Sequence, residues 1–197
     1  WIPTLSTTTH ASVMAFLPGV LDKVLGIYLV ARMSVDWFAP TPALRQVVMW
    51  LGILTILCAV LMALVQHDLR RLLSFHAVSQ VGYMLLGLGT GTLIGAMGGI
   101  FHMVNHALYK SCLFLGAGTV ERETGTLELD RLGGLGRTMP VTFGCMLVAA
   151  LSISGLPPLI ALFQVPAWFI QQLPMILQLV LDLFIAVGQF ALIFWFL

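Results

Sequence analysis

The chain has 197 residues, of which 59% are hydrophobic and 9% charged, and its mean hydropathy is +1.02. Because soluble domains carry roughly a quarter charged residues, this composition excludes a soluble globular protein and indicates an integral membrane protein. A net charge of +1 gives no reason to expect a nucleic-acid partner. Cys58, Cys112 and Cys145 each stand alone in an apolar run, which favours packing residues over a disulfide or metal site.

Several apolar segments are long enough to cross a bilayer, which takes about 20 mainly apolar residues. Five runs qualify: Ala11–Ala31, Gln46–Val65, Leu72–Thr90, Leu93–Val120 and Pro140–Leu159. The stretch Ala161–Leu197 has room for one more helix and part of another. Unbroken apolar runs exclude a β-barrel, so the sequence predicts an all-α, polytopic transmembrane helix bundle with about six transmembrane segments. Since the chain starts at Trp1 without Met and ends inside an apolar run, we expect a fragment of a longer membrane protein.

The arginines divide unequally if successive loops lie on opposite sides of the membrane. One side then holds only Arg32 and Arg45. The positive-inside rule predicts that the richer side is cytoplasmic, with Arg70 and Arg71 marking the membrane interface. The arginines of that richer side are Arg70, Arg71, Arg122, Arg131 and Arg137.

Three places interrupt the helical pattern. Pro18-Gly19 falls inside the first segment, Gly95, Gly98 and Gly99 begin the fourth, and Ser152–Leu159, with two consecutive prolines, closes the fifth. Prolines and glycines at membrane depth free backbone groups and often line a polar cavity. For the glycines of the fourth segment, close helix packing is an equal alternative. We predict broken helices, with the fifth ending its regular helix near Ser152–Pro158.

Lys23 lies in the middle of the first segment, with apolar residues on both sides. An ammonium at that depth costs about 2.5–3.5 kcal/mol on insertion scales, so we expect it to face the protein interior. Burial disfavours the charged form of an amine, which lets a lysine exchange a proton near neutral pH. Asp22 precedes it and could pair with Lys23 or with another helix. A static buried ion pair is the structural alternative to a proton carrier.

His102, His106 and Lys110 recur every fourth residue in the fourth segment. Each step rises about 6 Å and turns about 40° along a helix, so the three side chains share one stripe. Protons can pass between such groups through one or two waters, and imidazole titrates near physiological pH. Packing alone is the structural alternative, and a metal site for the two histidines is a further one, although no third ligand of suitable type stands nearby.

The third segment is polar in its first half, where we expect a wet interior facing the fourth. His76 could extend the proton relay there, but we favour a simple hydrogen bond to a neighbour. The other polar residues of this half are Ser74, Ser79, Gln80 and Tyr83.

Three motifs, in the same order along the chain, resemble those of a known family. They are DLRRLLSFHAVSQVGYM at Asp68–Met84, FHMVNHALYKSCLFLGAG at Phe101–Gly118 and LSISGLPP at Leu151–Pro158. Together they resemble the antiporter-like, proton-translocating membrane subunits of respiratory complex I, of Mrp-type cation/proton antiporters and of membrane-bound hydrogenases such as formate hydrogenlyase. The resemblance covers roughly residues 1–159 and implies half-channels built around broken helices.

The resemblance also implies roles for individual positions. Lys23 is similar to the mid-membrane lysine that follows the family's first broken helix, and Lys110 to the central lysine that joins the half-channels. His106 and His102 resemble the histidines one and two turns before that lysine. Thr7–Ala15 occupies the place of the family's broken-helix turn.

Two departures from the family pattern define the expected domains. The family's earlier helices, with their glutamate–lysine pair, would precede Trp1. After Pro158 the usual Gly-Phe and later Ser-Lys pair are replaced by LIALFQV, and Asp182 is the only charged residue of the tail. We therefore expect a partial antiporter-like membrane domain at 1–159 and a divergent hydrophobic tail at 160–197.

The leading hypothesis is a fragment of a proton-translocating subunit of a redox-driven complex, either of the NADH:quinone oxidoreductase type or of the membrane-bound hydrogenase type. The chain has no cysteine cluster or dinucleotide motif, so no cofactor is expected and redox groups would belong to partner subunits. Expected partners are other membrane and peripheral subunits, membrane lipid, and protons or Na+, in a bacterial or archaeal cytoplasmic membrane. A cation/proton antiporter subunit and a non-conducting membrane scaffold are the alternatives.

Overall fold

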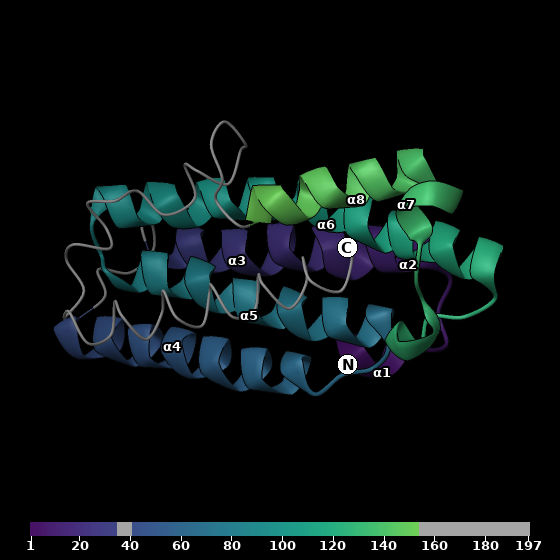
Figure 1. Ribbon diagram of the computed structural model, residues 1–197. Helices are drawn as coiled ribbons and strands as arrows, with labels where there is room; N and C mark the ends of the chain where they lie inside the picture. The colour runs from purple at the N-terminus through teal and green to yellow at the C-terminus, as the bar shows by residue number, and fades with distance from the viewer. Residues whose placement is uncertain (35–40, 154–197) are drawn as a thin grey trace.

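The computed structural model of the protein describes residues 1–34 and 41–153. These residues form an elongated bundle of helices (Figure 1), and the described part contains no β-strand beyond one isolated bridge. The all-α prediction is therefore confirmed. The predicted helices in Ala161–Leu197, the divergent tail at 160–197 and the predicted helix end beyond Ile153 lie outside the described residues.

Five of the predicted segments correspond to helical spans. The stretch Ala11–Arg32 and the two helices that follow it are long and apolar enough to cross a membrane. The next helix extends over about 48 Å at 1.5 Å per residue, which exceeds a hydrocarbon core of about 30 Å. The long helices are α4 (Pro42–Leu64), α5 (Leu69–Gly89), α6 (Leu93–Thr124) and the described part of α8 (Pro140–Ile153).

Side-chain caps decide where the long helices begin. Thr41 accepts a 3.3 Å hydrogen bond from Leu44 N at the start of α4, and Pro42 takes the first helical position, where no N–H is required. Asp68 caps α5 in the same way through Arg71 N at 2.8 Å. Thr92 caps α6, which ends at Thr124 and is followed by Gly125 with φ 71°, a left-handed conformation that favours glycine. The observed helix starts lie within four residues of the starts predicted from sequence at Gln46, Leu72 and Leu93.

The first membrane span, Ala11–Arg32, is preceded by a short helix and contains one π-helical turn. Helix α1 (Ile2–Leu5) is followed by a turn over residues 6–10, which covers only the first part of Thr7–Ala15, where the family resemblance implied a broken-helix turn. Helix α2 (Ala11–Phe16) then leads into a π-helical turn, Leu17–Leu21, and into α3 (Asp22–Arg32). The predicted interruption at Pro18-Gly19 is therefore one π-helical turn within a continuous span. Such turns commonly occur at functional sites in helices.

The chain reversals gather at the two ends of the bundle. The loop after α6 pairs with the start of α5, where Leu69 N donates to Leu127 O at 3.0 Å and Leu129 N to His67 O at 2.8 Å. At the opposite end Arg45 packs against the α5–α6 turn at Gly91. The loops of the arginine-rich side therefore meet at one end, as alternating loops predict.

The glycines at the start of α6 mostly serve close packing. A Cβ on Gly95 would lie 2.6 Å from the Gly87 carbonyl oxygen, and one on Gly99 would lie 3.0 Å from the Met84 carbonyl oxygen. Gly98 has nothing within 4 Å of that position. The packing alternative therefore holds for Gly95 and Gly99, which let α6 approach α5 closely.

Candidate functional site

The stripe predicted on α6 is present and buried. His102 is 4% exposed, while His106 and Lys110 are completely buried. The two imidazole rings are 6.3 Å apart between centroids, and the His102 ring lies 6.1 Å from the ring of Tyr83 on α5. The regular four-residue spacing thus produces a line of titratable groups along the interface of α6 with α5.

Lys110 bridges from α6 to α5. Its Nζ donates a 2.9 Å hydrogen bond to the Leu73 carbonyl oxygen and lies 5.9 Å from the centroid of the Phe114 ring. Leu73 and Phe114 are themselves completely buried in the apolar core. The ammonium therefore faces the protein interior, as the cost of exposing it to lipid predicts.

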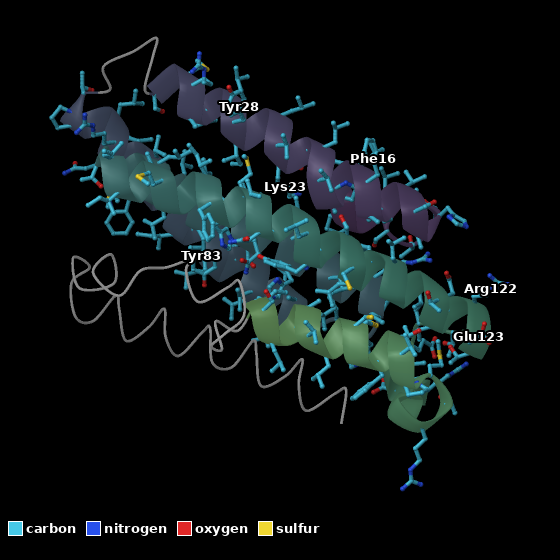
Figure 2. All side chains as sticks on the ribbon, turned by 90° about the horizontal axis from the view of Figure 1, so that it is seen from above. Phe16, Lys23, Tyr28, Tyr83, Arg122 and Glu123 are labelled. Carbon is cyan, nitrogen blue, oxygen red and sulfur yellow. The ribbon has the colours of Figure 1, made fainter. Side chains whose placement is uncertain are left out.

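Lys23 points into the bundle from α3, which packs against both α5 and α6. Figure 2 shows it where α3 faces α6, whereas Phe16 and Tyr28 lie on the outer side of the same span and are 58% and 50% exposed. The Lys23 side chain is completely buried, and its Nζ lies 3.0 Å from Asp22 Oδ2. Of the two partners considered for Asp22, the structure selects Lys23 itself. The Asp22 side chain remains 39% exposed.

His106 interacts with each of the other titratable residues of the predicted site. It interacts with both lysines as well as with His102 and His76, and the two lysines interact with each other. The fold thus brings together the predicted residues of three helical spans. Both ring nitrogens of His106 are buried without a hydrogen-bond partner in the described part of the chain.

His76 approaches this site from α5. It is half-buried and interacts electrostatically with Lys110 and His102. Its Nδ1 is buried and has no hydrogen-bond partner among residues 1–34 and 41–153, so the hydrogen bond expected from sequence is not found at that atom.

A second polar row was missed by the sequence reasoning. Tyr109 donates a 3.2 Å hydrogen bond from its hydroxyl to Gln80 Oε1 and meets the His106 ring edge-on at 5.3 Å. Asn105 is 4% exposed, and its Nδ2 has no partner in the described residues. Asn105 and Tyr109 immediately precede His106 and Lys110, so a helical wheel of the motif would have found them.

The chemical character of the site follows from its groups. Two amines and three imidazoles can accept and release protons, and the described residues contain no group of three His, Cys, Asp or Glu side chains placed to hold a metal ion. The arrangement suits proton exchange between neighbouring groups across a membrane-embedded helix.

Comparison with known proteins agrees with this architecture. The family model described as NADH:quinone oxidoreductase/Mrp antiporter, TM matches residues 1–194. The chain is 42% identical over 165 residues to an F(420)H(2) dehydrogenase subunit of Methanosarcina mazei, covering 79% of this chain and 23% of the relative. It is 38% identical over 164 residues to an Na(+)/H(+) antiporter subunit of Alkalihalophilus pseudofirmus, covering 83% of this chain and 33% of that relative.

A solved structure shares the fold. The structure of the Mrp complex from Dietzia sp. DQ12-45-1b superposes with a TM-score of 0.84 and 28% identity, covering 96% of this chain and 36% of that one. The chain thus spans a quarter to a third of the length of these relatives. It is an integral membrane protein and belongs to the NADH:quinone oxidoreductase/Mrp antiporter transmembrane family.

Proposed function

We propose that the chain is part of a proton-translocating membrane subunit of a redox-driven complex, of the NADH:quinone oxidoreductase or membrane-bound hydrogenase type. Protons pass between Lys23 and Lys110 by way of His106, with His102 and His76 as further sites. The observation that carries this proposal is the pair of completely buried lysines that interact electrostatically with each other and with His106 inside a membrane bundle.

Burial cost argues against a purely structural role for Lys110. A cation at the bilayer centre costs about 2.5–3.5 kcal/mol on insertion scales, and such residues are kept for function. Lys23 has the Asp22 carboxylate as a counter-charge, so a static ion pair could account for it. Lys110 has only a neutral carbonyl acceptor in the described residues. A static ion pair therefore does not account for Lys110.

The redox chemistry belongs elsewhere in the proposed complex. The chain supplies titratable groups but no recognised motif for a nicotinamide, flavin or iron–sulfur centre. Electron transfer would take place in other membrane and peripheral subunits, in the cytoplasmic membrane of a bacterium or archaeon. The dehydrogenase relative supports this assignment, because it too is named as one subunit of a larger enzyme.

A cation/proton antiporter subunit is the second candidate. The 38% identity to an Na(+)/H(+) antiporter subunit favours it, since the same buried lysines would serve exchange of protons against Na+. A non-conducting scaffold is the third, and it requires neither lysine to titrate.

The test is proton uptake by vesicles containing the full-length parent during turnover of its complex. Lys110→Ala should abolish most uptake while leaving assembly intact, because it removes a titratable group and its burial cost. Lys110→Arg should also fail, since a guanidinium stays protonated. Arg122→Ala, which removes an exposed cation at the far end of the same helix (Figure 2), is the control and should transport normally.

The outcome separates the candidates. Normal uptake by both Lys110 variants would support the scaffold and reject proton transfer at this position. Proton uptake that requires an opposing Na+ gradient, rather than electron donor, would assign the antiporter function.

A further inference from the structure

We propose that Arg70 is a positioning residue that sets where Lys23 lies relative to Lys110. It does so by fastening the turn before α2 to the ends of α5 and α6. This inference rests on the proposed proton transfer between the two lysines, but it concerns a different part of the molecule, at the arginine-rich end of the bundle.

The Arg70 guanidinium joins three segments. Its Nη2 forms an ion pair with Glu121 Oε2 near the end of α6, and its Nη1 donates a 3.3 Å hydrogen bond to the Thr9 carbonyl oxygen. The Arg70 side chain is 6% exposed, whereas Arg71 beside it is exposed. Of the two arginines expected at the membrane interface, only one is therefore free in solvent, and the other is buried in a contact between distant parts of the chain.

The Thr9 carbonyl is an effective point of attachment. Thr9 N donates back to Leu5 O at 3.0 Å, so the turn after α1 is already folded on itself. The next residue, His10, caps α2 through Ser12 N at 3.4 Å. Arg70 thus holds the chain one residue before the cap of the helical span that carries Lys23.

Small residues continue this attachment along the helix. Ala11, Ala15 and Gly19 recur every fourth residue and are buried. Ala11 packs directly against Gly118 of α6, where any larger residue would collide with it. Lys23 is the next residue at this four-residue spacing, at the end of the row nearest the proposed site.

Ser111 of α6 contacts the next residue of this row, Ala15. Its hydroxyl is shared between the Ala107 carbonyl oxygen of its own helix at 2.8 Å and the Ala15 carbonyl oxygen at 3.3 Å, and it lies 3.6 Å from where a Cβ on Gly19 would be. Ser111 directly follows Lys110, so the row links the position of one lysine to that of the other. Within a membrane, apolar burial adds little to helix association, and close packing of small residues together with interhelical hydrogen bonds aligns such surfaces.

The two partners of the ion pair differ in what their removal leaves behind. Replacing Arg70 leaves Glu121, whose side chain is 43% exposed and can be hydrated. Replacing Glu121 leaves a buried guanidinium without its counter-charge, which is far more destabilising. Arg70→Met is therefore the variant that removes the attachment while permitting assembly.

The experiment measures position and transport separately in the full-length parent. Ala15→Cys and Ser111→Cys are introduced after replacing the native cysteines by serine, and the rate of oxidative crosslinking reports the contact of α2 with α6. In Arg70→Met, both the crosslinking rate and proton uptake should fall by about tenfold, within the range by which packed contacts couple sites. Arg71→Met, which removes an exposed charge from the same helix, should change neither.

Arg70→Lys provides the conservative rescue. A lysine can keep the charge opposite Glu121, but its compact ammonium lacks the planar fork that reaches both partners. The crosslinking rate and proton uptake of Arg70→Lys should therefore lie between those of Arg70→Met and the unaltered protein. This variant also decides the matter if Arg70→Met fails to assemble.

The outcomes distinguish this inference from the proposed function. Unchanged crosslinking in Arg70→Met and Arg70→Lys would overturn the positioning role, whatever happens to transport. Normal uptake in these variants, alongside loss of uptake in Lys110→Ala, would also overturn it while leaving the proposed function in place. If Lys110→Ala transports normally, the proposed function fails, and the crosslinking rates alone show whether Arg70 positions α2.

Discussion

Lys110 is held by Leu73, with 2.9 Å between its Nζ and the carbonyl oxygen of that residue on the neighbouring helix. A carbonyl oxygen has two lone pairs, so Leu73 can accept this bond while keeping its place in the hydrogen-bond ladder of α5. Lys23, by contrast, has a carboxylate partner 3.0 Å away. The two buried lysines therefore differ in their partners, a neutral carbonyl for Lys110 and a carboxylate for Lys23.

Lys110→Met should not destabilise the protein. Methionine has nearly the shape of lysine, and replacing a buried charge by an apolar group of similar volume is often neutral or stabilising. Thermal unfolding of the purified parent in detergent should therefore give a midpoint equal to or above that of the unaltered protein. A midpoint lowered by more than about 4 °C, on the order of 1 kcal/mol, would mean that Lys110 stabilises the bundle through its bond to Leu73.

Asp22→Ala should impair transport more than Asp22→Asn. The carboxylate is the counter-charge of Lys23, and Asp22→Ala leaves the buried amine with neither a counter-charge nor this acceptor. Asparagine keeps an oxygen that can accept the Lys23 proton donor, although it carries no charge. We expect proton uptake to fall about tenfold in Asp22→Ala, the loss expected for about 1.4 kcal/mol. Equal uptake in both variants would show that Lys23 works without its neighbour.

His106→Ala should reduce proton uptake less than Lys110→Ala does. His106 is completely buried and interacts electrostatically with both lysines, but the rings of His102 and Tyr109 lie 6.3 and 5.3 Å from its own, so water replacing the imidazole would have polar neighbours. We expect a loss of about fivefold in His106→Ala. Lys110→Ala should lose about a hundredfold, because a positioned acid–base group contributes about a hundredfold or more to the rate. A complete loss in His106→Ala would make the imidazole an obligatory carrier.

Sequence reasoning succeeded where one helix suffices to make the prediction. The stripe of His102, His106 and Lys110 follows from helical spacing alone, and apolar length identifies the spans. The interruption at Pro18-Gly19 was also found, since proline disturbs a helix wherever it stands. Each of these features depends on residues close together in the chain.

The features that were missed depend on contacts between helices. Nothing in the motif shows that Tyr109 hydrogen-bonds Gln80, because the two residues are 29 positions apart. The sequence Arg70-Arg71 predicts two charges at the membrane interface. Arg70 is instead buried, because Glu121 from another helix supplies its counter-charge. Sequence spacing shows which residues share one face of a helix. Only the folded structure shows which residues of another helix they contact.

Gly82→Ala should destabilise the bundle, because α4 and α5 approach each other with backbone in direct contact there. A Cβ on Gly82 would lie 2.6 Å from the Gly52 carbonyl oxygen and 3.0 Å from the backbone nitrogen of Ile56. Backbone atoms cannot move aside as a flexible side chain would, so the helices must separate, at a typical cost of about 1–3 kcal/mol for overpacking. Gly98→Ala is the matched control, since nothing lies within 4 Å of its added Cβ. Thermal unfolding in detergent should show a lowered midpoint for Gly82→Ala alone. Equal midpoints for the two variants would mean that α4 and α5 do not pack through this glycine contact.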